Sequence, residues 1–327
     1  MIQTQLSGET STITPAKIDF AVGGQALIEG VLMRSPNFNA ISVRKPDGAI
    51  TEKKELYKNI VQRVKVLNIP VIRGVINMFE MMFIGTKALN FSSLQLFGEP
   101  EKVENAKPEN SLAANLSVLF STVFGLLLAV ALFKFVPLLL TNLASGFWPA
   151  LNDNYLLYNL LDACIKTSLF VGYITLMSLL PDVKRVFMYH GAEHKSIMTY
   201  EHGLPLTVEN ARTQTRFHPR CGTSFILIVF LLSIAVFTLI PKNPDFFANF
   251  LTRLLALPLV AGLSNELLKS TAKHSDNWFF KIISAPGLLM QRITTQEPDD
   301  GMLEVALNSL KLALDSEKSY QKQNELL

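Results

Sequence analysis

The residues best suited to chemistry in this sequence are His190, Glu193 and His194, which form an H-x-x-E-H motif. In a helix, histidines at positions i and i+4 lie on the same face, one turn apart. Two neutral imidazoles so placed can bind a divalent cation such as zinc, and a neighbouring carboxylate can take a proton from an activated water. The motif, an inverted form of a common zinc-peptidase pattern, predicts a metal centre with Glu193 as general base. A pair of hydrogen-bonded histidines at a helix contact is the simpler alternative.

A metal centre needs further ligands, and the sequence offers two sets. Glu266 lies near the end of an apolar segment, where a carboxylate is costly unless it is paired or bound to a cation. With His190 and His194 it would complete a catalytic site that keeps one open position. The alternative ligands are His218 and Cys221, which together with the two motif histidines would form a closed, structural site. A salt bridge for Glu266 and simple burial for Cys221 are the interpretations without a metal.

The motif must be carried by a helix, and residues 183–200 predict one, preceded by Pro181 and Asp182. Along one side of this helix the two histidines fall among apolar residues, so we expect them to face inward. His202 and Gly203 predict the end of the helix, with Gly203 in the left-handed conformation.

Four segments are apolar and long enough to cross a bilayer, and we expect four transmembrane helices at about 112–140, 156–180, 224–240 and 246–268. Thirteen Lys and Arg precede the first segment, none lies in 141–155, and six lie in 181–223. By the positive-inside rule, this alternation places both termini on the cytoplasmic or stromal side. The motif, His218, Cys221 and Glu266 would then all lie at that face of the membrane.

The composition also indicates a membrane protein rather than a soluble one. Of 327 residues, 49% are hydrophobic and only 17% are charged, and the net charge of +3 gives no indication of nucleic-acid binding. The two cysteines predict no disulfide framework. We therefore expect the partners to be the lipid bilayer, a membrane or peptide substrate, and a second copy of the chain or a membrane complex.

The expected fold is mainly α-helical: a polytopic membrane protein with four transmembrane helices, cytoplasmic helices and a small N-terminal β-hairpin. The hairpin is predicted by alternating residues on both sides of Asp47 and Gly48. Residues 56–97 predict a helix broken at Pro70, which either lies on the membrane or packs beneath the other cytoplasmic elements. The predicted division begins with a disordered terminus (1–20), a hairpin with a helical segment (21–98) and a linker (99–111). A four-span domain (112–283), which contains a loop at 181–223, and a C-terminal helix (284–327) follow.

Several stretches resemble the YqhQ-like family of bacterial and plastid proteins, namely residues 23–36, 189–195, 218–224 and 286–304. The resemblance covers most of residues 20–314. It implies a protein of the inner, plasma or plastid membrane, and a predicted metal-dependent enzyme whose domain has no known function. It also implies a shared core pattern consisting of His190, Glu193, His194, His218, Cys221, Glu266, Asp299 and Asp300.

Three functions fit these features. The first is a membrane-embedded metal hydrolase, most plausibly a peptidase. The second is a non-catalytic membrane assembly or insertion factor, in which the polar cluster shapes a cytoplasmic vestibule. The third is a structural zinc protein, in which the metal ties two spans together.

Overall fold

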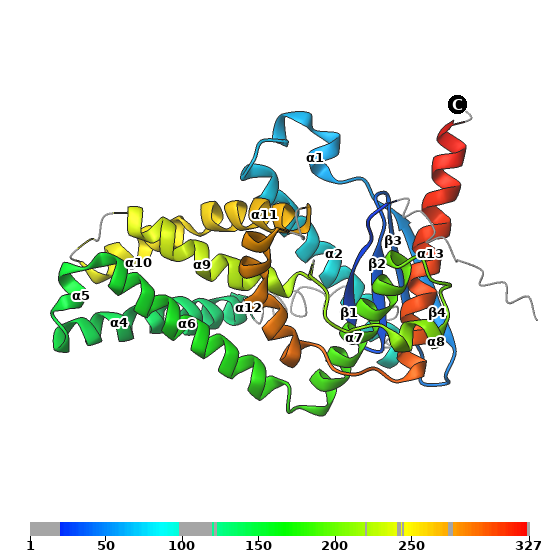
Figure 1. Ribbon diagram of the computed structural model, residues 1–327, viewed down its shortest axis with the longest axis horizontal. Helices are drawn as coiled ribbons and strands as arrows, with labels where there is room; N and C mark the ends of the chain where they lie inside the picture. Colours follow the sequence, from blue (N-terminus) through cyan, green and yellow to red (C-terminus); the bar gives the residue numbers. More distant parts are fainter. Residues whose placement is uncertain are drawn as a thin grey trace, which may run out of the picture.

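The computed structural model describes residues 20–97, 120, 123–219, 221–240, 243, 245–273 and 277–325. The linker predicted at 99–111 lies outside these ranges, and so does the predicted disordered terminus apart from Phe20. The described chain is mainly helical. Figure 1 shows a small sheet with α7, α8 and α13 beside it at one end, and a group of long helices that extends away from the sheet.

The sheet is an antiparallel meander in the order β1-β2-β3-β4, with strands Gly23–Leu27, Gly30–Arg34, Phe38–Arg44 and Ile50–Leu56. The predicted hairpin is confirmed as β3 and β4, and its turn contains Gly48 with a positive φ of 88°. The sequence did not reveal the hairpin of β1 and β2, because these strands are short and lack an alternating pattern.

Both faces of the sheet are covered, which explains why β2 is almost continuously buried rather than alternating. Val31 and Met33 face a core that they share with α7 and α13. Leu32 and Ile41 face the opposite way and pack against Ile84 and its neighbours on α2. Ser309 of α13 donates a hydrogen bond to the sheet through its hydroxyl group. The sheet therefore connects helices from both halves of the chain.

The labelled helices and helical turns lie within the described residues. They are α1 (Ile60–Arg63), the 3-10 turn η1 (Lys65–Leu67), α2 (Ile72–Phe97), the π-helical turn η3 (Ala131–Phe135), α4 (Val136–Phe147), α5 (Ala150–Asp153), α6 (Tyr155–Met177), α7 (Pro181–Glu201), α8 (Val208–Thr213), α9 (Thr223–Leu239), α10 (Phe246–Leu255), α11 (Leu257–Lys273), α12 (Trp278–Thr294) and α13 (Asp300–Glu325). The helix predicted at 183–200 is confirmed as α7, and the break predicted at Pro70 separates η1 from α2.

Within the part of the chain that the structure describes, three helices are long and apolar enough to cross a membrane: Val123–Phe147, Tyr155–Met177 and Phe246–Thr271. The last of these combines α10 and α11. The remaining predicted span, at about 224–240, corresponds to α9, whose 17 residues are fewer than the roughly 20 that a membrane crossing usually needs.

The helix α2 joins the sheet to the candidate spans. Its Gly74 packs directly on the backbone of Gly262 in α11, where an added Cβ would lie 2.8 Å from the Gly262 carbonyl oxygen. Further along, α2 covers the sheet, while Phe79, Met82 and Phe83 remain exposed. The helix α2 thus packs against other elements, as one interpretation of residues 56–97 expects. It also presents an apolar face, as expected of a helix that lies on the membrane.

Candidate metal centre

The motif lies in the middle of α7, where the helix is most deeply buried. Glu193 is 5% exposed and His194 is 1% exposed. The helix begins with Pro181 in its first turn and ends at His202, followed by Gly203 with a φ of 67°, as the sequence predicts.

A glycine within the motif allows another segment of the chain to pack tightly against α7. A Cβ added at Gly191 would lie 2.1 Å from the carbonyl oxygen of Gln296. The Gln296 N–H also donates to the Phe187 carbonyl at 2.9 Å. The stretch after α12 therefore lies directly on the motif.

Both motif histidines are oriented by backbone carbonyl groups. His190 Nδ1 lies 2.8 Å from the Thr294 carbonyl oxygen, and His194 Nδ1 lies 2.6 Å from that of Arg216. A carbonyl oxygen only accepts, so Nδ1 carries the proton in each ring and Nε2 keeps its lone pair. This arrangement is typical of metal-binding histidines, whose second nitrogen is held by an outer partner.

The third group is Cys221, which precedes α9. Its Sγ lies 3.2 Å from His190 Nε2, and the Thr223 N–H donates to it at 3.4 Å. Candidate ligand atoms of His190, His194 and Cys221 all lie within 4.8 Å of one another. With bonds of about 2.0–2.3 Å, ligand atoms on one tetrahedral zinc ion would lie roughly 3.3–3.7 Å apart. A modest side-chain movement would therefore suffice to bind one ion.

The loop that carries Cys221 is fixed by one buried amide. Gln291 of α12 accepts a hydrogen bond from the His218 N–H and donates one to the His218 carbonyl, both at 2.8 Å. Gln291 has no exposed surface. The cysteine therefore approaches the histidines because α12 holds its loop in place.

Burial sets the protonation of the site. Burial lowers the pKa of His194 well below its ordinary value and lowers the pKa of His218 to about 4. Both rings are therefore neutral at pH 7, which is the form that binds metals. Burial also raises the pKa of the Cys221 thiol.

Glu193 is the buried acid of the centre. Burial raises its pKa to about 8, while the electrostatic interaction with the His190 ring and a hydrogen bond from the Gly24 N–H act in the opposite direction. Gly24 belongs to β1, and a Cβ there would lie 2.7 Å from Glu193 Cγ. The glycine thus allows the sheet to approach the carboxylate.

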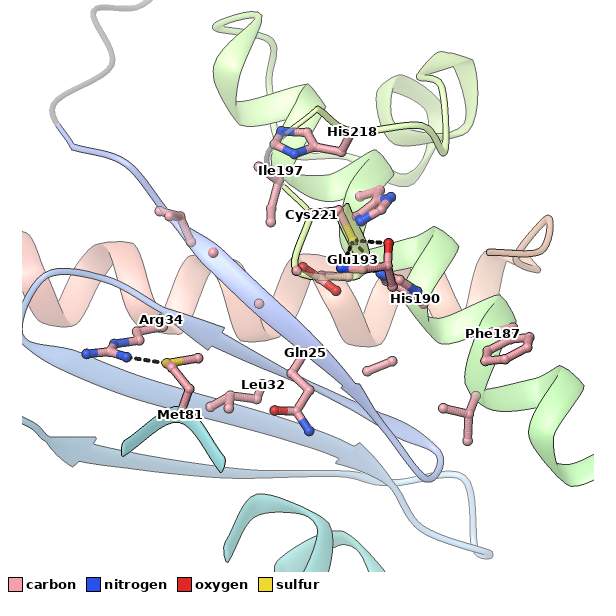
Figure 2. Close-up of a pocket in the computed structure, with 18 residues that line it drawn as sticks. Gln25, Leu32, Arg34, Met81, Phe187, His190, Glu193, Ile197, His218 and Cys221 are labelled. Atoms are coloured by element: carbon pink, nitrogen blue, oxygen red, sulfur yellow. Dashed lines mark hydrogen bonds between the residues drawn. The ribbon is translucent and has the colours of Figure 1, made fainter. Parts of the chain in front are cut away.

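The candidate ligands border a cavity of about 510 Å³ between the sheet, α7 and the loop before α9. Figure 2 shows His190, Glu193 and Cys221 on one side of it, with Gln25 and Arg34 on the sheet. The cavity is large enough to admit part of a substrate beside the metal-binding atoms.

The structure does not bring Glu266 into this group. Its carboxylate accepts from Arg73 Nε at 2.7 Å and from a second nitrogen of the same guanidinium, and Lys269 Nζ lies 3.8 Å away. The reason is the contact of α2 with α11, which brings Arg73 to Glu266. The structure therefore separates Glu266 from the motif histidines and brings Cys221 to them instead.

His218 lies beside the group without belonging to it. Its ring centroid is 5.6 Å from that of His194, and its Nε2 lies 3.3 Å from a Glu201 carboxylate oxygen. It also lines the cavity. Of the two alternative ligands predicted, the structure thus brings Cys221 to the motif histidines and pairs His218 with Glu201.

Sequence reasoning missed the groups that orient the ligands. Two of them are the carbonyls of Thr294 and Arg216, and no residue type marks a carbonyl that accepts from a histidine. Gln291 and Gly24 were also missed as partners of the site. For Gln291, the only available signal was the presence of a glutamine in an apolar helix.

Comparison with known proteins places the chain among close relatives. The family model described as "Protein of unknown function (DUF1385)" matches residues 69–316. The chain is 37% identical over 297 residues to "Uncharacterized protein YqhQ" of Bacillus subtilis (strain 168), covering 90% of this chain and 92% of that protein. No solved structure matches the chain.

Proposed function

The chain belongs to the YqhQ-like family DUF1385, and we propose that it is an integral membrane hydrolase, specifically a peptidase, with a zinc-like centre. The ligands in this proposal are His190, His194 and Cys221. One observation carries it: both histidines have Nδ1 fixed to a carbonyl, and their remaining nitrogens lie in one buried group with a thiol.

The chain's own residues divide the work of the proposed reaction. A divalent cation held by the three ligands supplies Lewis-acid activation of water and of a carbonyl group. Three protein ligands would leave a bound cation able to take up water or a substrate carbonyl, and all three line the cavity. Glu193 lines the same cavity. A cation held beside it would favour the ionised carboxylate against the burial that raises its pKa to about 8, and the carboxylate would then accept the proton of the attacking water and return it to the leaving amine. Gly24 holds this carboxylate through its N–H.

The edge of the sheet favours a peptide as the substrate. Among the described strands, β1 pairs with β2 alone, and residues 22–26 all line the cavity. An extended peptide can add to such an edge through backbone hydrogen bonds, which hold it beside the reacting groups regardless of its side chains.

The proposed topology has four crossings, with both termini on the cytoplasmic or stromal side. The helices α7 and α13 both pack against the sheet, so they lie on the same side of the membrane. The chain must then cross the membrane an even number of times between them. Phe246–Thr271 supplies one crossing, and α9 is the apolar helix available for the other. This parity argument supports α9 as the short fourth span.

A structural role for the same cluster, in a non-catalytic assembly or insertion factor, is the second candidate. It is favoured by the way the cluster joins separate elements: His190 on α7 contacts the end of α12, and Cys221 leads directly into α9. A metal there would tie the cytoplasmic part to the spans without any reaction.

Two measurements test the proposal. The first is zinc content, by mass spectrometry, of detergent-purified wild-type, His194→Ala and Glu193→Gln proteins. We expect one zinc per wild-type chain, loss in His194→Ala and retention in Glu193→Gln. The second is incorporation of ¹⁸O from labelled water into new carboxyl groups of a pool of hydrophobic peptides. Zinc in both the wild type and Glu193→Gln, together with ¹⁸O incorporation by the wild type alone, supports the hydrolase.

Other outcomes reject it. Zinc without ¹⁸O incorporation by the wild type, combined with unfolding of His194→Ala, supports the structural role. If the wild-type protein neither retains zinc nor binds added zinc, both the hydrolase and the structural metal role are excluded.

A further inference from the structure

A second polar cluster lies far from the candidate metal centre, within the candidate membrane spans. It contains three cationic side chains and one carboxylate, all less than 7% exposed: Lys134, Lys166, Arg253 and Asp162. Lys134 and Lys166 lie near the midpoints of Val123–Phe147 and Tyr155–Met177. Ionisable side chains at such depth are costly and usually serve a purpose in the interior of a helix bundle.

Two of the cations share the only carboxylate of the cluster. Asp162 Oδ2 accepts from Lys166 Nζ at 2.9 Å and lies 3.4 Å from Arg253 Nη1. The Arg253 guanidinium also donates to the Asn159 side-chain oxygen at 2.6 Å and to the Tyr155 hydroxyl at 2.9 Å. These two cations are therefore well partnered within the bundle.

The third cation lacks an anionic partner. Lys134 Nζ lies 4.1 Å from the centroid of the Phe237 ring, and among the residues that the structure describes it has no hydrogen-bond acceptor or ion pair. The same ring is also approached by Lys166 and Arg253. Three basic side chains thus surround one ring with a single carboxylate among them, which leaves an excess of positive charge whenever all three are protonated.

A cavity of about 250 Å³ lies beside this excess charge, between η3, α6, α9 and α11. Its polar lining consists of Lys134, Lys166 and Ser233, and the rest of its lining is apolar. Lys134 belongs to η3, a π-helical turn, and such turns occur often at functional sites. The site therefore combines fixed cations with an apolar wall.

We propose that this cavity binds the anionic head of a lipid-soluble molecule, a carboxylate or phosphate attached to an apolar chain. The head pairs with the ammonium groups of Lys134 and Lys166, and the chain lies along the aromatic wall. Such a ligand supplies the negative charge that the cluster lacks, in a region where water is scarce. The proposal is independent of the metal centre.

The test uses the full-length protein, stripped of lipid in a neutral detergent, and equilibrium binding of radiolabelled palmitate. The competitors are unlabelled palmitate, methyl palmitate, phosphatidylglycerol and phosphatidylcholine. We expect palmitate to compete at least about tenfold more strongly than methyl palmitate, because the ester lacks the charge. This comparison uses the wild-type protein alone and requires no variant to fold.

Variants then locate the site. Lys134→Met should weaken palmitate binding by at least about tenfold, whereas Lys134→Arg, which keeps the charge, should remain within about threefold. Lys184→Met, at an exposed position on α7, is the matched control and should bind as the wild type does. Strong competition by phosphatidylglycerol but not by phosphatidylcholine would identify a membrane phospholipid as the source, and competition by palmitate alone would identify a free fatty acid.

Three results would overturn the proposal. One is equal competition by palmitate and methyl palmitate. Another is unchanged binding by Lys134→Met. The last is the absence of saturable binding of both palmitate and phosphatidylglycerol.

Discussion

The sharpest prediction concerns which third residue binds zinc. Replacement of Cys221 by Ser removes the thiolate of the group formed with His190 and His194. A hydroxyl is a much poorer zinc ligand than a thiolate, so we expect the zinc dissociation constant to rise at least about 100-fold, or about 2.8 kcal/mol at about 1.4 kcal/mol per decade. Glu266→Gln is the matched control, because its carboxylate pairs with Arg73.

The structure predicts a small effect for that control. The Arg73 and Glu266 side chains are 31% and 22% exposed, and an ion pair near the surface contributes about 0–1 kcal/mol. Zinc affinity of Glu266→Gln should therefore stay within about threefold of the wild type, whichever way the helices adjust.

The assay is competition for zinc between the detergent-solubilised protein and a chromophoric chelator, under reducing conditions that keep Cys221 a thiol. The unfolding temperature of each metal-free variant is recorded to separate loss of a ligand from loss of the fold. If Glu266→Gln loses zinc while Cys221→Ser binds it as the wild type does, the ligand assignment made from the structure is wrong.

Three further predictions follow from contacts around the site. Gly24→Ala should displace the Glu193 carboxylate, since the new Cβ would lie 2.7 Å from that side chain. We expect the rate of hydrolysis to fall at least about tenfold while zinc affinity is retained. An unchanged rate, or a loss of zinc, in hydrolysis assays and zinc titrations of the same preparation would contradict this. Gln291→Leu should leave two buried backbone groups of His218 unpaired and lower the free energy of unfolding by about 2–5 kcal/mol, and a denaturation midpoint equal to that of the wild type would count against it. Arg185 lowers the pKa of Glu29 through a hydrogen bond. The stability that Glu29 contributes is therefore complete above the ordinary carboxyl pKa of 4.5 and is lost as the pH falls through the lowered value. The unfolding temperatures of the wild type and Glu29→Gln should differ at pH 7 and converge in acid, and a difference that does not change with pH would contradict this.

Local patterns predicted the elements of the site well. The span of α7, the end of that helix at His202 and the turn at Gly48 all follow from short-range rules of capping and turn geometry. Asp299 also caps α13, accepting from the Met302 N–H at 2.8 Å. The hairpin of β1 and β2 did not follow, because β1 is a short strand that begins with two glycines and β2 is buried almost throughout, so neither shows alternation.

The third ligand shows where such reasoning stops. Hydropathy and charge place both Cys221 and Glu266 near one face of the membrane, so they fix the depth of each residue but not the direction in which it points. That direction depends on contacts distant in sequence: α2 meets α11 at Gly74 and brings a guanidinium to Glu266, while Gln291 holds the loop that carries the cysteine. An expensive carboxylate was correctly expected to have a partner. The partner of Glu266 is Arg73. The group that lies beside the histidines is Cys221, although its position at the membrane edge is equally consistent with a small buried residue.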